Sequence, residues 1–135
     1  MQILLKLLWI AGLIQLAMVA ANIYLPKKLK YRENLSGVTP MFRQIFIVHA
    51  AYIVGVVLLF AVLTLTFGAE LASGRGLGRF LAVAMCAFWF CRVPLQLLYF
   101  DSALRRANRL GDMVMTAALV FLAATYGAAA ILPAI

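Results

Sequence analysis

Arg92 is the residue whose type and position could do the most chemistry in this sequence. It lies in an apolar block near residues 80–100, ~3 Å from the middle of a helix at 1.5 Å per residue. A charge at such depth costs at least about 2.5–3.5 kcal/mol. Gln96 would share its face one turn later, and Pro94 leaves the Phe90 carbonyl without a donor and predicts a kink. Arg92 therefore either anchors an anionic or carbonyl ligand, or bonds glutamine and carbonyl groups inside the protein; both interpretations stay open.

Other polar side chains gather at a similar depth in the apolar blocks. Three of them lie roughly one turn inside the predicted helices, counted from the helix ends next to the basic loops: Asn22, His49 and Gln96. Gln15 lies deeper, near the level of Arg92. Gln15 and Asn22 are seven residues apart, so they share one helix face. In the other half of the predicted helices, away from the basic loops, the polar side chains are three threonines. The candidate ligand or polar-network residues are therefore Arg92, Gln96, His49, Asn22 and Gln15.

The sequence requires no cofactor or metal. A single histidine, His49, cannot supply bis-His haem ligation or a facial triad, although one axial bond to a pigment or haem stays open. We expect His49 to bond a neighbouring helix through Gln96 or Tyr52. Cys86 and Cys91 lie about 140° apart on one helix, which excludes an intrahelical disulfide. Their separation in the sequence is not a zinc-binding spacing. The identity of any cofactor stays unknown.

The four carboxylates argue against catalysis, because all of them lie in loops or at predicted helix ends: Glu33, Glu70, Asp101 and Asp112. No Ser-His-Asp set, phosphate-binding loop or H-x-x-x-H pattern is present. We expect a non-catalytic integral membrane protein, an accessory or structural subunit of a larger membrane complex. The alternative is a binding module for a lipid, quinone or pigment in the cytoplasmic half. A small transporter or lipid-modifying enzyme is the weaker alternative.

Composition dictates the elements that must position these residues. The chain has 135 residues, of which 67% are apolar and 12% charged, whereas soluble domains average about 45–50% and about 25%. This excludes a soluble fold and a disordered chain. Four blocks approach the roughly 20 residues that cross a membrane, without the alternation of a barrel. We expect one transmembrane domain over residues 1–135, an all-α four-helix bundle with helices at about 7–25, 40–67, 80–100 and 113–132.

Local signals mark several helix ends. Thr39 and Pro40 predict an N-cap followed by proline at the first helical position. Four glycines within residues 68–78 predict a tight hairpin. We expect the third loop to extend the third helix, with Gly111 ending that extension and Asp112 capping the fourth helix.

The net charge of +8 serves as an orientation signal. Basic residues lie between apolar blocks, which disfavours nucleic acid as a partner. The loops at residues 26–44 and 101–112 contain five and three Lys or Arg residues. The segments on the other side of the membrane contain three. The positive-inside rule then places the first and third loops in the cytoplasm and both termini outside. We expect the first block to be a retained helix, not a signal peptide, because cleavage would leave those five cations outside.

The fourth helix carries small residues at a spacing that allows close helix contact: Ala123 with Gly127, and Ala124 with Ala128. The contact lies within the bundle or with another subunit. The expected partners are membrane lipids and either other membrane-protein subunits or further copies of this chain.

Two short motifs carry a resemblance. They are Arg43-Gln44-Ile45-Phe46 and the set Phe88, Trp89, Arg92, Gln96 and Asp101. This pattern resembles an uncharacterised family of small four-helix bacterial inner-membrane proteins, and Pro94 departs from it. The resemblance implies the same fold and a bacterial inner-membrane location, and it implies no activity.

Overall fold

Four long helices build the protein. The computed structural model describes residues 1–132, and of Leu104 it describes the backbone alone. Within that range every regular element is helical. The long helices are α1 (Gln2–Lys28), α3 (Pro40–Thr66), α5 (Gly76–Pro94), which continues as the π-helix η1 (Leu95–Tyr99), and α7 (Arg109–Ile131). Each is long and apolar enough to cross a membrane, which indicates an integral membrane protein.

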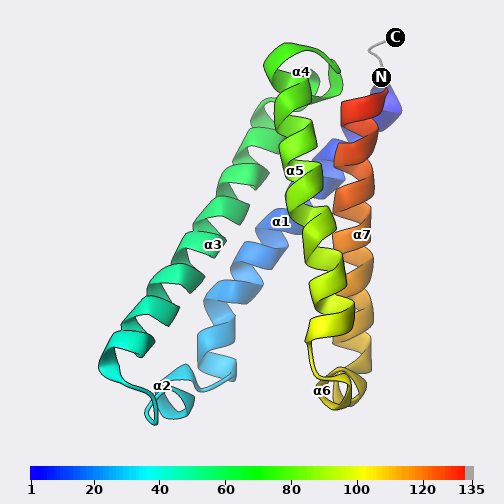
Figure 1. The fold of residues 1–135 in the computed structure, drawn as a ribbon. Helices are drawn as coiled ribbons and strands as arrows, with labels where there is room; N and C mark the ends of the chain where they lie inside the picture. Colours follow the sequence, from blue (N-terminus) through cyan, green and yellow to red (C-terminus); the bar gives the residue numbers. More distant parts are fainter. Residues whose placement is uncertain (133–135) are drawn as a thin grey trace.

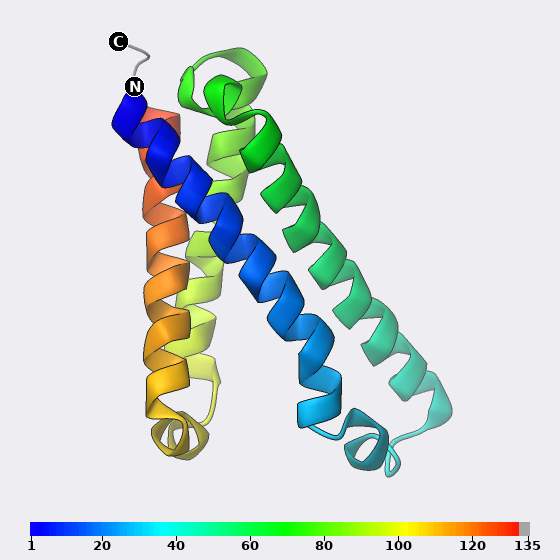
Figure 2. The ribbon, with the colours of Figure 1, turned by 180° about the vertical axis from the view of Figure 1, so that it is seen from behind.

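The long helices form two pairs that diverge. Figures 1 and 2 show α1 beside α3 and α5 beside α7, and the pairs approach each other near the short helix α4 (Gly68–Ala72). They separate toward the other end, where α2 (Tyr31–Asn34) and α6 (Ser102–Ala107) lie. We call the α4 end the narrow end and the α2 and α6 end the wide end. The N-terminus lies at the narrow end (Figure 1).

The hydrophobic core fills one half of the length of the bundle. Counted from the narrow end, the last buried residues of the four long helices are Val19, Val57, Trp89 and Leu119. Beyond them, toward the wide end, no residue that the structure describes in these helices is buried. The two pairs are therefore held together near the narrow end and are free of each other near the wide end.

The connection at the narrow end is a compact turn that contains α4. Gly74 and Gly76 adopt positive φ angles of 63° and 50°, which L side chains adopt rarely. A Cβ atom added at Gly78 would collide with the carbonyl oxygen of Glu70. The glycines thus allow α5 to begin directly against α4, as the predicted hairpin requires.

The ends of α3 and α7 differ in how well the local signals predict them. The predicted cap of α3 is confirmed, because Thr39 Oγ1 accepts a hydrogen bond from the Phe42 amide at 3.4 Å and Pro40 is the first helical residue. The predictions for Gly111 and Asp112 are wrong: α7 begins at Arg109, and both residues lie inside its first turns. The Asp112 carboxylate binds side chains from neighbouring elements instead of its own helix end.

The third loop is likewise not a continuous extension of the third helix. Phe100 is extended, with φ −74° and ψ 140°, and it separates η1 from α6. A π-helical turn follows Pro94 directly, at the position where the sequence predicts a kink. Proline lacks the amide that an α-helical bond would need, and wide turns relieve such a gap.

Candidate functional site

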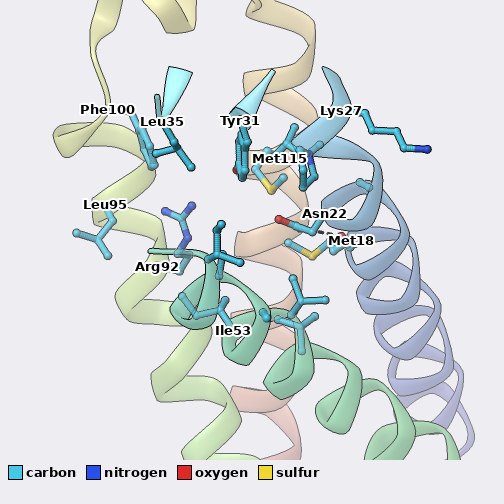
Figure 3. Close-up of a pocket in the computed structure, with 18 of the residues that line it drawn as sticks. Met18, Asn22, Lys27, Tyr31, Leu35, Ile53, Arg92, Leu95, Phe100 and Met115 are labelled. Carbon is cyan, nitrogen blue, oxygen red and sulfur yellow. Dashed lines mark hydrogen bonds between the residues drawn. The ribbon is translucent and has the colours of Figure 1, made fainter. Parts of the chain in front are cut away.

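A cleft of about 1560 Å³ lies between the two helix pairs in the half that lacks a core. Its walls come from α1 and α3 on one side and from α5 and η1 on the other, with Met115 and Leu119 of α7 between them. Residues of α2 line it at the wide end (Figure 3). Most of the wall is apolar, and Asn22 is one of the few polar side chains along it.

Arg92 extends from α5 into this cleft (Figure 3). Its side chain is half-buried, and its Cζ atom lies 5.2 Å from the centre of the Phe100 ring. Because α5 and η1 together run over residues 76–99, Arg92 lies ~7 Å from the middle of this span, on the wide side. It is therefore closer to the end of the helix than a span over residues 80–100 predicts.

No partner within the described chain neutralises Arg92. The ion pairs among residues 1–132 are Lys30 with Glu33 at 3.7 Å and Arg105 with Asp112 at 2.9 Å. None of the hydrogen bonds between described residues reaches the Arg92 guanidinium, which lies over the face of the Phe100 ring. The half-buried charge thus faces the cleft without a counter-ion from this chain.

Gln96 does not join Arg92, although the i+4 spacing predicts a shared face. Its Nε2 atom donates to Asp112 Oδ1 at 2.9 Å, and Gln96 does not line the cleft. The π-helical turn over residues 95–99 advances fewer degrees per residue than an α-helix does. Residues on either side of Pro94 therefore lose the register that an α-helix would give them.

The Asp112 cluster consists of Gln96, Arg105 and Asp112, and it closes the turn between η1 and α7. Arg105 Nε and Nη2 donate to the two oxygens of Asp112, both at 2.9 Å, and Arg105 Nη1 donates to the Leu97 carbonyl at 2.7 Å. The hydrogen bond with Asp112 raises the pKa of the Arg105 guanidinium above its usual value. Asp112 thus binds Arg105 and Gln96, and it forms no ion pair with Arg92 among the described residues.

Basic residues dominate the charges along the cleft. Besides Arg92 they come from the end of α1, the α2 segment and the start of α3: Lys27, Lys30, Arg32 and Arg43. The lining contains one carboxylate, Glu33, which lies near Lys30. The wide end of the cleft is therefore strongly positive.

The α2 segment is fixed to α3. Arg43 Nε donates to the Leu35 carbonyl at 3.0 Å, and its Nη2 donates to the Ser36 carbonyl at 3.4 Å. The rings of Tyr31 and Phe46 meet edge to face at 5.6 Å between centroids. These contacts hold α2 where its side chains can line the cleft.

Asn22 and His49 bond within their own helices. Asn22 lines the cleft, and its Nδ2 atom donates to the Met18 carbonyl at 2.7 Å. His49 is exposed, does not line the cleft, and has its Nδ1 atom 2.8 Å from the Ile45 carbonyl. The expected contact of His49 with Gln96 or Tyr52 is absent from the described hydrogen bonds. The structure thus brings Asn22 and Arg92 to one cleft and leaves His49 outside it.

Gln15 belongs to a separate, fully buried cluster with Tyr126 and Thr64. Gln15 Nε2 donates to the Tyr126 hydroxyl at 2.7 Å, and the Thr64 and Tyr126 hydroxyls are 2.5 Å apart. Thr64 also donates to the Phe60 carbonyl at 2.7 Å. The cluster joins α1, α3 and α7 where the pairs meet. Tyr126 is not among the residues predicted from the sequence. Its predicted depth, close to that of Thr64 and Thr125 in the same half of the helices, was a usable signal.

Three aromatic rings pack together beside the cleft, and two of them, Phe88 and Trp89, line it. Phe60 of α3 meets Phe88 of α5 edge to face at 5.1 Å, and Phe88 meets Trp89 in the same way at 5.1 Å. Trp89 is 2% exposed, and its indole N–H has no partner among the described residues. These three rings mark the boundary between the core and the cleft.

The small residues of α7 divide between two faces. The Ala123 carbonyl accepts from the Cys86 thiol at 3.4 Å, and a Cβ added at Gly127 would lie 3.4 Å from the same sulfur. Ala123 and Gly127 therefore lie against α5 within this chain. Ala124 is exposed and Ala128 is half-buried.

Comparisons with protein families, curated proteins and solved structures found no match. Among the described residues, no three His, Cys, Asp or Glu side chains lie close enough together to hold a metal ion. The geometry and charge of the cleft are therefore the features that indicate what the protein does.

Proposed function

We propose that the protein is a non-catalytic binding module whose cleft holds a lipid-like molecule. The observation that carries this proposal is the cleft itself, an apolar space of about 1560 Å³ with a positive wide end. Pockets for ordinary small molecules measure roughly 300–1,000 Å³. A larger apolar space with charge at one end matches an amphiphile with long hydrocarbon chains.

The missing half of the core supports the same proposal. No side chain that the structure describes packs across these apolar walls, so the dispersion contacts of a close-packed core must come from another apolar molecule. Hydrocarbon chains of a bound molecule would restore those contacts between the diverging helix pairs. The described residues lining the cleft include no nucleophile with an adjacent base, which favours binding over catalysis.

We place this module in a bacterial inner membrane, with the wide end and its two loops in the cytoplasm and both termini outside. The distribution of Lys and Arg supports this orientation, and the resemblance noted from the sequence supports the location. A role as an accessory subunit of a larger complex stays a prediction. The apolar outer surface does not distinguish such a subunit from a lone protein, because any membrane bundle presents an apolar surface to lipid.

Native mass spectrometry of the protein in mild detergent tests the proposal. We expect wild-type protein to keep a lipid-mass adduct under activation that strips loosely bound lipid. The double variant Ala21→Trp, Ala50→Trp narrows the cleft from the α1 and α3 wall, so it should retain several-fold less adduct. The control Ala84→Trp, Ala124→Trp changes two exposed residues outside the cleft. Equal adduct retention in both double variants would contradict the proposal.

A further inference from the structure

We infer that the cleft selects a phospholipid of net negative charge, whose phosphate binds the guanidinium of Arg92. The inference rests on the proposed binding function and names the class of molecule that the cleft takes. It excludes an uncharged quinone or pigment as the preferred occupant, because neither would neutralise this arginine.

Arg92 needs an anion from outside the chain. A guanidinium in a membrane interior must find a partner, since unpaired charge there is costly. Asp112 is bound at both oxygens by Arg105 and at one of them by Gln96, and Glu33 lies near Lys30. A phosphate diester offers two oxygens that match the forked donors of arginine.

The charges along the cleft are complementary to a negatively charged head group. The residues that line the cleft include five cations and one carboxylate, so the wide end carries a net positive charge. A zwitterionic head group would bring an ammonium group into this positive field, whereas an anionic head group brings none. Basic residues near a membrane surface favour anionic lipids for the same reason.

The depth of Arg92 decides where a bound phosphate would lie. Arg92 lies seven residues before Tyr99, the last residue of η1, which is about 10 Å along the helix axis. Its side chain reaches toward Phe100, beyond that end. The phosphate would then lie slightly below the wide end, in reach of a lipid that enters from the same leaflet.

The apolar walls of the cleft suit hydrocarbon chains. From Arg92 toward the narrow end the cleft is lined by apolar side chains such as Met18 and Ile53 (Figure 3). Phe88 and Leu119 also line it. Acyl chains along these walls would occupy the space that the core leaves unfilled. The positive end and the apolar end of the cleft thus follow the order of head group and tails in a phospholipid.

Competition between two lipids tests the inference. The protein in mild detergent receives equal amounts of phosphatidylglycerol and phosphatidylcholine with identical acyl chains, and native mass spectrometry measures the ratio bound. We expect wild type to prefer phosphatidylglycerol about tenfold, as one charge-assisted contact implies. Arg92→Gln should lower the preference several-fold, and the four other basic residues of the lining account for what remains. Arg79→Gln, an exposed arginine on the same helix outside the cleft, should leave it unchanged.

The outcomes separate this inference from the proposed function. If Arg92→Gln keeps the full preference, Arg92 does not bind the phosphate and the inference is wrong. If wild type binds both lipids equally, the head-group selection is wrong while the binding function stands. If wild type retains neither lipid, both fail. Arg92→Lys, which keeps the charge, should retain most of the preference. Should Arg92→Gln not fold, Arg92→Met, which replaces the charge with an apolar side chain, gives the same test, and a full preference in that variant overturns the inference. Excess inorganic phosphate should displace no lipid, since phosphate alone lacks the tails.

Discussion

At the scale of single residues, Tyr126 shows how one hydroxyl can connect three helices inside a membrane. Its oxygen meets Gln15 of α1 and Thr64 of α3 while the ring belongs to α7. No water is present at such depth to replace a lost partner. Hydrogen bonds between membrane helices average about 0.6 kcal/mol and reach about 1.7 kcal/mol, so two bonds at one atom are a sizeable part of the contact between the pairs.

Tyr126→Phe should lower the free energy of unfolding by about 1–2 kcal/mol, because it removes both bonds and leaves the Gln15 amide without its partner. Denaturation by sodium dodecyl sulfate from mild detergent micelles, followed by circular dichroism, measures the change. Tyr52→Phe is the matched control, since Tyr52 is 74% exposed. Equal denaturation midpoints for the two variants would show that the cluster does not stabilise the bundle.

At the scale of elements, the end of the third span depends on contacts from outside that span. Pro94 and the π-helix η1 interrupt regular helical bonding, and the Leu97 carbonyl accepts from Arg105 of α6. Asp112 then holds Arg105 from α7. The turn at the wide end of this pair is therefore closed by side chains and not by continuous helix.

Asp112→Asn should open this turn. The substitution keeps the size of the side chain but removes the charge that holds Arg105, so α6 should become more mobile. Trypsin cleavage after Arg105 and Arg106 in detergent should become several-fold faster, measured by gel and mass spectrometry. Glu33→Gln is the control, because its partner Lys30 is exposed and such surface pairs contribute little. Unchanged cleavage in Asp112→Asn would argue against this role.

The turn at the narrow end depends on close backbone contact instead. Gly78→Ala should destabilise the protein by about 1–3 kcal/mol, because its Cβ would collide with the Glu70 carbonyl and force α4 away from α5. Gly55→Ala is the matched control: a Cβ there meets nothing within 4 Å, so the change should stabilise α3 by up to about 1 kcal/mol. Detergent-based unfolding measures both. Similar shifts for the two alanines would refute the close contact.

The elements show which features a sequence can predict. Apolar length and the Thr39 cap are local properties, and both were predicted correctly. The register around Gln96 was not, because the π-helical turn changes the face on which it lies. Asp112 was expected at a helix cap, where aspartate is common, but its partners Gln96 and Arg105 come from elements whose approach depends on tertiary packing.

At the scale of the whole molecule, the orientation of the cleft decides which leaflet could supply its ligand. A cysteine at Gly37 near the wide end and one at Ala69 in α4, each in a background with Cys86 and Cys91 replaced by alanine, report the two sides. In intact cells a membrane-impermeant maleimide should label the Ala69→Cys variant, and Gly37→Cys should react only after lysis, as the positive-inside rule predicts. The reverse pattern would invert the orientation and place the cleft in the outer half.

The divergence of the helix pairs is the feature that sequence reasoning could not supply. Four apolar blocks predict four spans, but they do not say that core packing ends near Val57 and Trp89. Both residues look like ordinary members of apolar runs. The importance of Arg92 could be predicted, because the free-energy cost of a charge in lipid depends only on the residue and its depth. That no carboxylate of the described residues pairs with Arg92 could not be predicted, because it depends on where Asp112 and Glu33 find their partners.

The confinement of the core to one half of the bundle has a consequence for how this protein can change over evolutionary time. Substitutions along the walls of the wide half alter few buried contacts, so they should be tolerated by the fold far better than substitutions among Leu8, Met85 or Leu122. Preference for a particular head group or chain length could therefore drift with little loss of stability. Such a scaffold can be adapted to a new ligand one residue at a time while the same narrow end keeps the helices assembled.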